Sequence, residues 1–213
     1  MIEKVSDHYN RRAVSYGREP RACNYRFRGS YLQRQRVVMK RLQGITGRRI
    51  LDVGCGPGLF SEPLARSNFL VGVDLSENML RLARGILKPV GGEGEHLAFQ
   101  DELFDITLSI ETLQHVGCPE IFLKELARVT RPDGRIILSS LNRDSLLHRI
   151  LGGKSNFFHP LEAVCSFLEK EGWVPVEIRF LGFPLPLTWP SPLKNRGLSF
   201  LATSWVVEFR KRP

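Results

Sequence analysis

Three glycines stand at every second position in the stretch DVGCGPG, which directly follows an apolar run ending at Asp52. Gly54, Gly56 and Gly58 carry no side chains, so a bound molecule can approach the backbone closely there. The next apolar run, VGVD, ends in a second acidic residue, Asp74. A carboxylate at that position can accept hydrogen bonds from both hydroxyl groups of an adenosine ribose. The two stretches therefore indicate a ligand whose sugar meets Asp74 and whose remaining part lies against the glycines.

The spacing of the glycines argues against a dinucleotide. Dinucleotide-binding loops have the spacing GxGxxG, whereas this chain has GxGxG with Pro57 inside the turn, where its ring stiffens the backbone. The glycines alone are a weak indication, because nucleotide-binding dehydrogenases carry similar ones. Asp74 also has a simpler interpretation, in which it only caps the helix expected to begin at Ser76.

Apolar runs and amphipathic stretches alternate along the chain after residue 46. Strands are expected at RRILDVG, FLVGVDLS, LFDITLSIETL and RIILSSL, and helices between them at GLFSEPLARS, SENMLRLARGIL and PEIFLKELARVT. The stretch PVGGEGEHLAF is expected to be a loop with a weak strand signal, and RPDG a turn. Such alternation predicts a parallel sheet with helices on both faces.

The C-terminal part departs from this alternation. LEAVCSFLEKEG predicts a helix closed by Gly172, and two strands follow at WVPVEIRFLGF and LSFLATSWVVEFRK. Two strands with no helix between them predict an antiparallel hairpin at the edge of the sheet. Residues 1–46 are expected to be helical and to lie over the end of the sheet. A length of 213 residues suits a single domain.

The net charge of +9 is concentrated at the N-terminus. Residues 1–49 contain thirteen lysines and arginines against three acidic residues, and most of the excess is arginine. The guanidinium group matches carboxylates and phosphates, so the partner could be a nucleic acid, an acidic small molecule or a lipid surface. The alternative is a solvated helix surface without a partner. The arginines concerned are Arg11, Arg12, Arg18, Arg21, Arg26, Arg28, Arg34 and Arg36.

The cysteines and the apolar runs predict a cytoplasmic protein with reduced thiols. Cys23, Cys55, Cys118 and Cys165 are far apart in the chain and form no CxxC pair, so neither a zinc site nor a disulfide framework is expected. The apolar run LSFLATSWVV is too short to span a bilayer, and the first residues do not resemble a signal peptide.

Four stretches together resemble the class I S-adenosylmethionine-dependent methyltransferases. They are ILDVGCGPG, VGVDLSENML, GEGEHLAFQDELFDITLS and LARVTRPDGRIIL, in this order over residues 50–141. The third follows the family pattern GDAExLPFxDxxFD, with Glu93 in place of aspartate and Ala98 in place of proline. The resemblance implies a Rossmann-like, doubly wound α/β fold with a seven-stranded sheet, an antiparallel last strand and helices on both faces. It divides the chain into a helical lid (1–46), a cofactor-binding core (47–141) and an acceptor-side part (142–213).

The resemblance also implies S-adenosylmethionine as the cofactor and S-adenosylhomocysteine as the product. Asp52 and the backbone of the loop would hold the methionine part, Asp74 the ribose hydroxyls, and Leu75 would pack on the adenine. Glu93 would reach the adenine amino group, and the carbonyl of Ser109 would lie near the sulfonium. The remaining cofactor contacts would come from the backbone at Gly54, Cys55, Gly56, Gly58, Gly94 and Glu95. Glu93 and Glu95 could equally be ordinary loop acids.

The stretch SIETLQHV resembles the ME-x-LEH-V stretch of quinone-biosynthesis O-methyltransferases. Glu111 and His115 match, and Gln114 stands where that family has glutamate. A neutral His115 could take the proton of a phenol near neutral pH; the alternative is a histidine that only helps to shape the cofactor pocket. Acids of that family can hold a metal, but Gln114 removes one charge, and no metal is expected here.

Further resemblances concern the acceptor side. Tyr9 and Tyr16 match an N-terminal Y-x-x-x-A-x-x-Y segment that would close over cofactor and substrate, or would only pack between helices. Asn142 and Arg143 match a TLNRN stretch that would line the acceptor pocket. The proline-rich segment 180–193 could form a rigid apolar flap over a hydrophobic acceptor, touch a membrane surface, or pack as an edge loop.

Three functions are compatible with these features. The first is methyl transfer to an oxygen or nitrogen of a small-molecule acceptor that is apolar or anionic, such as a quinone precursor, a lipid or a sugar derivative. The second is methylation of RNA or protein, docked through the basic N-terminal segment; a nucleic acid is less favoured because no RNA-binding module or NPPY-type motif accompanies it. The third is cofactor binding without catalysis in an assembly. The sequence does not indicate an oligomeric state.

Overall fold

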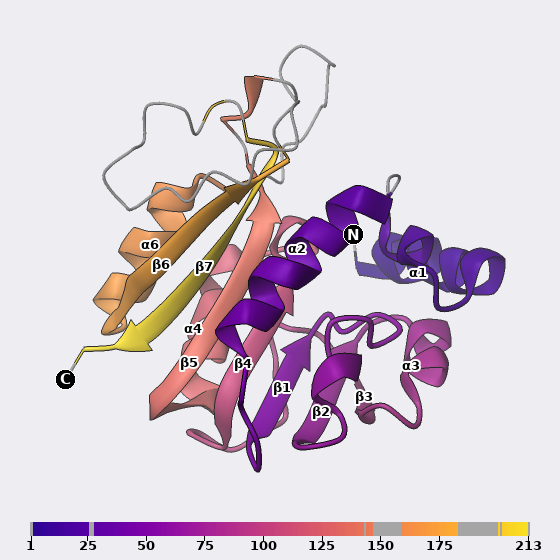
Figure 1. Ribbon diagram of the computed structural model, residues 1–213, viewed down its shortest axis with the longest axis horizontal. Helices are drawn as coiled ribbons and strands as arrows, with labels where there is room; N and C mark the ends of the chain where they lie inside the picture. Colours follow the sequence, from indigo (N-terminus) through magenta and orange to yellow (C-terminus); the bar gives the residue numbers. More distant parts are fainter. Residues whose placement is uncertain are drawn as a thin grey trace.

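The computed structural model describes residues 2–25, 28–142, 144–146, 159–182, 200 and 202–212. A seven-stranded sheet with the order β3-β2-β1-β4-β5-β7-β6 runs through the molecule (Figure 1). Only β7 runs against the other strands, since it pairs antiparallel with both β5 and β6. The strands are β1 (Arg49–Val53), β2 (Phe69–Asp74), β3 (Lys88–Gly91), β4 (Phe104–Ile110), β5 (Thr130–Leu141), β6 (Trp173–Leu181) and β7 (Ser204–Lys211). The doubly wound fold with an antiparallel last strand is confirmed.

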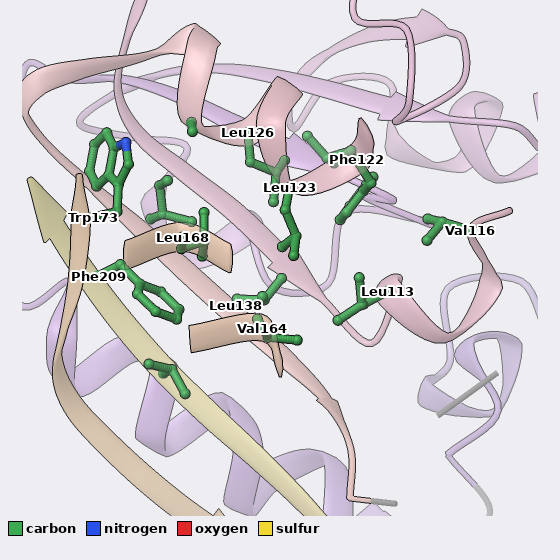
Figure 2. Close-up of a cluster of buried hydrophobic side chains, with 14 of the residues drawn as sticks. Leu113, Val116, Phe122, Leu123, Leu126, Leu138, Val164, Leu168, Trp173 and Phe209 are labelled. Atoms are coloured by element: carbon green, nitrogen blue, oxygen red, sulfur yellow. The ribbon is translucent and has the colours of Figure 1, made fainter. Parts of the chain in front are cut away.

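Helices cover both faces of the sheet. One layer consists of α4 (Pro119–Val129) and α6 (Leu161–Lys170), and the other contains α2 (Arg28–Arg41) and α3 (Glu77–Ala83). Short 3₁₀ helices lie at η1 (Pro20–Cys23), η2 (Glu62–Leu64) and η3 (Leu113–His115). Figure 2 shows apolar side chains of α4 and α6 in one cluster with Leu138 of β5.

Alternation along the strands divides the core into two parts. Leu51 of β1 and Leu138 of β5 belong to the cluster under α4 and α6, whereas Ile50 and Ile137 belong to the cluster under α2 and α3. Successive side chains of a strand point to opposite faces, so the nearly continuous apolar runs are those of a sheet buried on both sides.

Several element boundaries differ from the expectations. The stretch GLFSEPLARS forms only the short η2, and the helix that begins after Ser76 ends at Ala83. The loop expected around Val90 contains β3, which pairs parallel with β2. RPDG lies within the bounds of β5 but forms a bulge: β4 pairs with Thr130 and next with Arg135, and a Cβ on Gly134 would lie 2.7 Å from the carbonyl oxygen of Asp105 and 2.9 Å from that of Arg131. The chain thus turns at RPDG, as expected, between two paired parts of β5.

The last two strands form the antiparallel pair that was expected at the edge of the sheet. β7 inserts between β5 and β6, so that β6 is the edge strand. The reason lies in the side chains of β7, because its first six residues are buried, including Trp205 and Phe209. A strand with apolar side chains on both faces is favoured inside a sheet.

The N-terminal segment is divided between two places. α1 (Ile2–Tyr16) contacts α3 and η1 near the carboxyl ends of the strands, as expected (Figure 1). α2, in contrast, packs on the face of the sheet, because Val38 belongs to the same cluster as Ile137 and Val206. The expectation that all of residues 1–46 cover the end of the sheet is therefore wrong for α2.

Candidate functional site

A cavity lies beyond the carboxyl ends of β1, β2 and β4, at the place where ligands bind in doubly wound sheets. Its floor is formed by the loop after β1, the end of β2, the loop after β3 and the end of β4. Side chains of α1 and of the segment after it close the cavity from the other side; they include Val5, Tyr9, Cys23 and Tyr25.

The glycine loop has the backbone geometry that its sequence predicts. Gly54 has φ +75°, and a Cβ on it would lie 2.0 Å from the Thr112 Oγ1. Its N–H and that of Cys55 both donate to the carbonyl of Val73, which joins the loop to the end of β2. Only glycine satisfies both the left-handed φ and the lack of space at this position. The loop backbone therefore forms one wall of the cavity.

Asp74 connects the glycine loop to the following helix. Its Oδ2 accepts from the N–H of Gly56 at 2.8 Å, and its Oδ1 accepts from the N–H of Ser76 at 2.8 Å. The cap of α3 is the Ser76 hydroxyl, which accepts from the N–H of Met79. Asp74 is thus more than a helix cap: it is oriented by two backbone groups and lies on the cavity wall. Burial raises its pKa, and the backbone hydrogen bonds oppose that shift.

Asp52 is the second buried carboxyl group of the cavity. It accepts a hydrogen bond from the Ser61 hydroxyl at 2.5 Å, and burial raises its pKa to about 6 against the effect of that bond. Among the described residues neither Asp52 nor Asp74 has an ion-pair partner. A cationic ligand with hydroxyl groups would relieve both buried carboxyls. S-adenosylmethionine, with a positive sulfur, an ammonium group and a ribose, fits this pair.

The loop after β3 only partly matches the roles expected of it. Gly94 and Glu95 lie on the cavity wall, but the Glu95 carboxylate accepts from the N–H groups of Gly117 (2.6 Å) and Cys118 (3.0 Å) at the start of α4. The Glu95 side chain therefore caps the N-terminus of α4. Glu93 does not line the cavity, although Gly92 beside it does.

Two other expected cofactor residues lie behind the wall. Gly58 has φ +78° and would bring a Cβ to 3.2 Å from Ile86, so it allows the loop to pack on the segment after α3. Ser109 is buried in β4, and the next residue, Ile110, reaches the cavity. Leu75 and Cys55, in contrast, both line it.

His115 faces the cavity from the end of η3. Its Nε2 lies 2.9 Å from the Tyr9 hydroxyl, and the two rings meet edge to face. Burial lowers the pKa of His115, Glu111 opposes that shift, and His8 adds to it. The imidazole is therefore held neutral at neutral pH. Tyr9 and His115, which the sequence singled out separately, are in direct contact on the cavity wall.

A buried ion pair supports the wall beside His115. Arg34 is 3.0 Å from the Glu111 carboxylate and also donates to the hydroxyls of Ser139 (3.1 Å) and Ser204 (2.6 Å). Glu111 has the unusual φ of +60°, which such a set of contacts can maintain. Gln114 donates to Glu111 at 3.2 Å and is thus a neutral amide partner of that carboxylate.

The sequence placed Arg34 in a basic segment with an anionic partner or a solvated surface as alternatives, and it indicated no place in the site for Tyr25 or Cys23. Tyr25 lines the cavity, and its buried hydroxyl has no hydrogen-bond partner among the described residues. Nothing local in the sequence distinguishes these residues, because distant elements create their surroundings.

The remaining expected acceptor residues lie elsewhere. Tyr16 is 37% exposed beneath the Arg12 guanidinium and does not reach the cavity. Asn142 is buried away from the cavity and donates to the carbonyl of Ala202 at 2.9 Å, which fixes the start of β7. Arg143 and most of the expected flap, residues 183–193, lie outside the described residues.

Two features are absent from the described part of the chain. No group of three or more histidine, cysteine, aspartate or glutamate side chains there is arranged to hold a metal ion. Likewise, none of the helices in that part combines the length and the apolar character needed to cross a membrane.

Known proteins resemble the chain in sequence. A family model described as a methyltransferase domain matches residues 51–138. A ubiquinone biosynthesis O-methyltransferase from Azorhizobium caulinodans is 39% identical over 110 residues, which cover 48% of this chain and 44% of that protein. The proteins of the same name from Roseobacter denitrificans and Ruegeria pomeroyi are 32% and 34% identical over 176 residues, which cover 72% of this chain and 70% of each relative. Some alignments thus span less than half of the curated relative.

Solved structures of methyltransferases also resemble the chain. A SAM-dependent methyltransferase from Thermotoga maritima, described as a possible histamine N-methyltransferase, has a TM-score of 0.69 at 27% identity and covers 87% of this chain and 90% of that one. A chain from the complex of the Haloferax volcanii Trm112 methyltransferase activator with a methyltransferase has a TM-score of 0.72 and covers 98% of both chains, but at 16% identity it shows the fold alone.

Proposed function

Because this chain belongs to the class I S-adenosylmethionine-dependent methyltransferases, we propose that it transfers the methyl group to an oxygen or nitrogen of a small-molecule acceptor. The observation that carries the proposal is the position of His115. Its Nε2 faces a cavity that α1 closes from the solvent side, through Val5, Ser6 and Tyr9. A cavity closed in this way admits a small molecule more readily than a folded macromolecule.

S-adenosylmethionine supplies, when bound, a methyl group on a positively charged sulfur. We assign its methionine part to Asp52 and to the backbone of Gly54–Gly56, its ribose to Asp74, and its adenine to Leu75 and the loop at Gly92–Glu95. The two buried carboxyls support this assignment, since burial raises the pKa of both and a positive ligand would offset that cost.

The chain contributes mainly alignment and the exclusion of water. Correct placement of two reacting groups can lower a barrier by roughly 7–11 kcal/mol at best. An acceptor hydroxyl must also lose its proton, and His115 Nε2 is the group that takes it in this proposal. Burial lowers the pKa of His115, so the imidazole is unprotonated and ready to act as a base near pH 7.

We favour an aromatic or apolar acceptor of the quinone-precursor kind. The cavity is lined by the rings of Tyr9, Tyr25 and Phe60 together with the apolar Leu59 and Ile110. The curated relatives named above are ubiquinone biosynthesis O-methyltransferases. A lipid or a sugar derivative is the alternative small acceptor.

Methylation of RNA or protein is the second candidate. Arg28, Arg36 and Lys40 are exposed along α2 and form no ion pair with any described residue. Such a basic surface could bind a polyanion, and that binding would weaken steeply with added salt. RNA binding that is absent or insensitive to salt would exclude the RNA form of this function.

The deciding experiment uses S-adenosylmethionine with a labelled methyl group and a cell extract. After incubation, metabolites, lipids, RNA and protein are separated and counted. We expect label in the metabolite or lipid fraction, and its loss with His115→Gln. Label confined to RNA or protein would overturn the small-molecule proposal.

A further inference from the structure

A row of three hydrogen-bonding side chains leads from the N-terminal segment to His115. Asn24 follows η1 with a left-handed φ of +61°, and its Nδ2 donates to the Tyr9 hydroxyl oxygen at 3.2 Å. The same oxygen lies 2.9 Å from His115 Nε2. The side chains thus come from three elements and meet only in the folded chain.

The donor and acceptor roles along this row follow from the chemistry of its first member. The Asn24 amide nitrogen can only donate hydrogen bonds, so the Tyr9 oxygen is the acceptor of this bond. The proton of Tyr9 is then free to point at its other neighbour, His115 Nε2. A ring nitrogen that accepts a hydrogen bond carries no proton, and a neutral imidazole then has its proton on Nδ1.

Tyr9 is fixed by residues on either side of it in α1. The Ser6 hydroxyl donates to the carbonyl of Leu75 at 3.0 Å. The Asn10 Oδ1 accepts from the Ser76 hydroxyl at 2.7 Å and from the N–H of Asn78 at 3.1 Å. The segment that follows β2 therefore anchors α1 on both sides of Tyr9, independently of His115.

The charged groups around the row are consistent with these roles. His8 of α1 and Glu111 at the end of β4 act on His115 in opposite directions, and burial lowers its pKa. Burial likewise raises the pKa of Tyr9, with Cys23, Asp74 and Glu111 adding to the shift and Asn24 opposing it. Tyr9 therefore keeps the proton that it donates.

We propose that Tyr9 and Asn24 are positioning residues for His115. They hold the neutral imidazole with its proton on Nδ1 and its Nε2 lone pair on the Tyr9 hydroxyl, until an acceptor hydroxyl in the cavity takes the place of the Tyr9 hydroxyl. The acceptor proton then passes to Nε2, and the acceptor oxygen becomes free to take the methyl group. This inference rests on the proposed role of His115 as the base.

The tautomer can be measured without an acceptor. Long-range ¹H–¹⁵N NMR spectra of the full chain, labelled at histidine and saturated with S-adenosylhomocysteine, distinguish a protonated from an unprotonated ring nitrogen, and His115→Gln assigns the signals. We expect Nδ1 protonated and Nε2 unprotonated at pH 7. Nε2 protonated in the wild-type chain would overturn the proposal.

Two variants test the direction of the row. Asn24→Asp has nearly the same shape and tolerates the left-handed backbone, but its carboxylate accepts the Tyr9 proton. Tyr9 must then accept from His115, so we expect the imidazole proton to move to Nε2. Tyr9→Phe removes the donor that stabilises the neutral ring and should raise the pKa of His115 by about 0.5–1 unit. An unchanged tautomer in Asn24→Asp would contradict the proposal.

Tyr16→Phe is the matched control. Tyr16 lies on the same helix, is partly exposed and does not reach the cavity, so its loss should leave the His115 signals unchanged. The labelled-methyl experiment reports separately on the proposed function. If no small molecule is labelled but the imidazole has the expected tautomer, the proposed acceptor class is wrong and the hydrogen-bonded row stands. If a small molecule is labelled but the tautomer is the other one, the acceptor class stands and the role of the row is wrong.

Discussion

Replacement of Gly54 by alanine tests whether the glycine loop requires a residue without a Cβ at this position. The substitution forces a residue with a Cβ into φ +75°, which costs roughly 1–2 kcal/mol. It also places that Cβ 2.0 Å from the Thr112 Oγ1, far inside van der Waals contact. Thr112 must move and give up its hydrogen bond to the carbonyl of Val53, worth about 1 kcal/mol.

The displacement of the packed loop adds roughly 1–3 kcal/mol. Gly54→Ala should therefore lower the free energy of unfolding by about 3–6 kcal/mol and abolish binding of S-adenosylhomocysteine. Gly85→Ala is the matched control, because Gly85 has φ +86° but a Cβ on it would meet no other atom within 4 Å. It should cost only about 1–2 kcal/mol.

Urea unfolding and titration calorimetry with S-adenosylhomocysteine measure both effects. The additional change Thr112→Ala should recover part of the lost stability, since the two nearest atoms, Oγ1 and Cγ2, are then gone while Cβ at 2.8 Å remains. Equal losses of stability in Gly54→Ala and Gly85→Ala would refute the argument from lack of space.

Three further changes test other parts of the site. Asp74→Ala should weaken S-adenosylhomocysteine binding more than tenfold in calorimetry, because a buried acceptor of hydroxyl hydrogen bonds is lost; unchanged affinity would exclude its role. Arg34→Leu leaves Glu111 without its buried partner and should lower the free energy of unfolding by about 3–5 kcal/mol, whereas exposed Arg36→Leu should change it little. Burial raises the pKa of Asp52 from 3.8 to about 6. Its protonation therefore stabilises the folded state below pH 4, and this stabilisation is lost as the pH rises through about 6. Asp52→Asn should flatten this part of the stability profile in urea unfolding, and an unchanged profile would contradict it.

The floor of the cavity was predictable because its signals are local. Gly54, Gly56 and Asp74 lie at the ends of neighbouring strands, and parallel strands bring their carboxyl ends to one edge of the sheet. A short motif therefore contains most of the geometry that it needs. The parallel arrangement of β1, β2, β4 and β5 follows from the same local alternation.

The wall near His115 was less predictable because it depends on distant parts of the chain. Arg34 looks like a surface arginine in a basic segment, and its burial depends on Ser139 of β5 and Ser204 of β7. Glu95 matches a family pattern, yet the start of α4 takes up its carboxylate. The insertion of β7 likewise depends on pairing with two strands far apart in sequence.

The hydrogen bonds from α1 to the segment after β2 have a consequence for the rate of turnover. Ser6 and Asn10 bind Leu75, Ser76 and Asn78, the segment next to the residue assigned to the ribose. A nucleoside bound there would lie beside α1, so we expect its departure to require detachment of this helix. Where such an opening is slower than the chemical step, it limits kcat. Weakening α1 by Asn10→Ala would then speed release even as it loosens the ring of Tyr9 over His115.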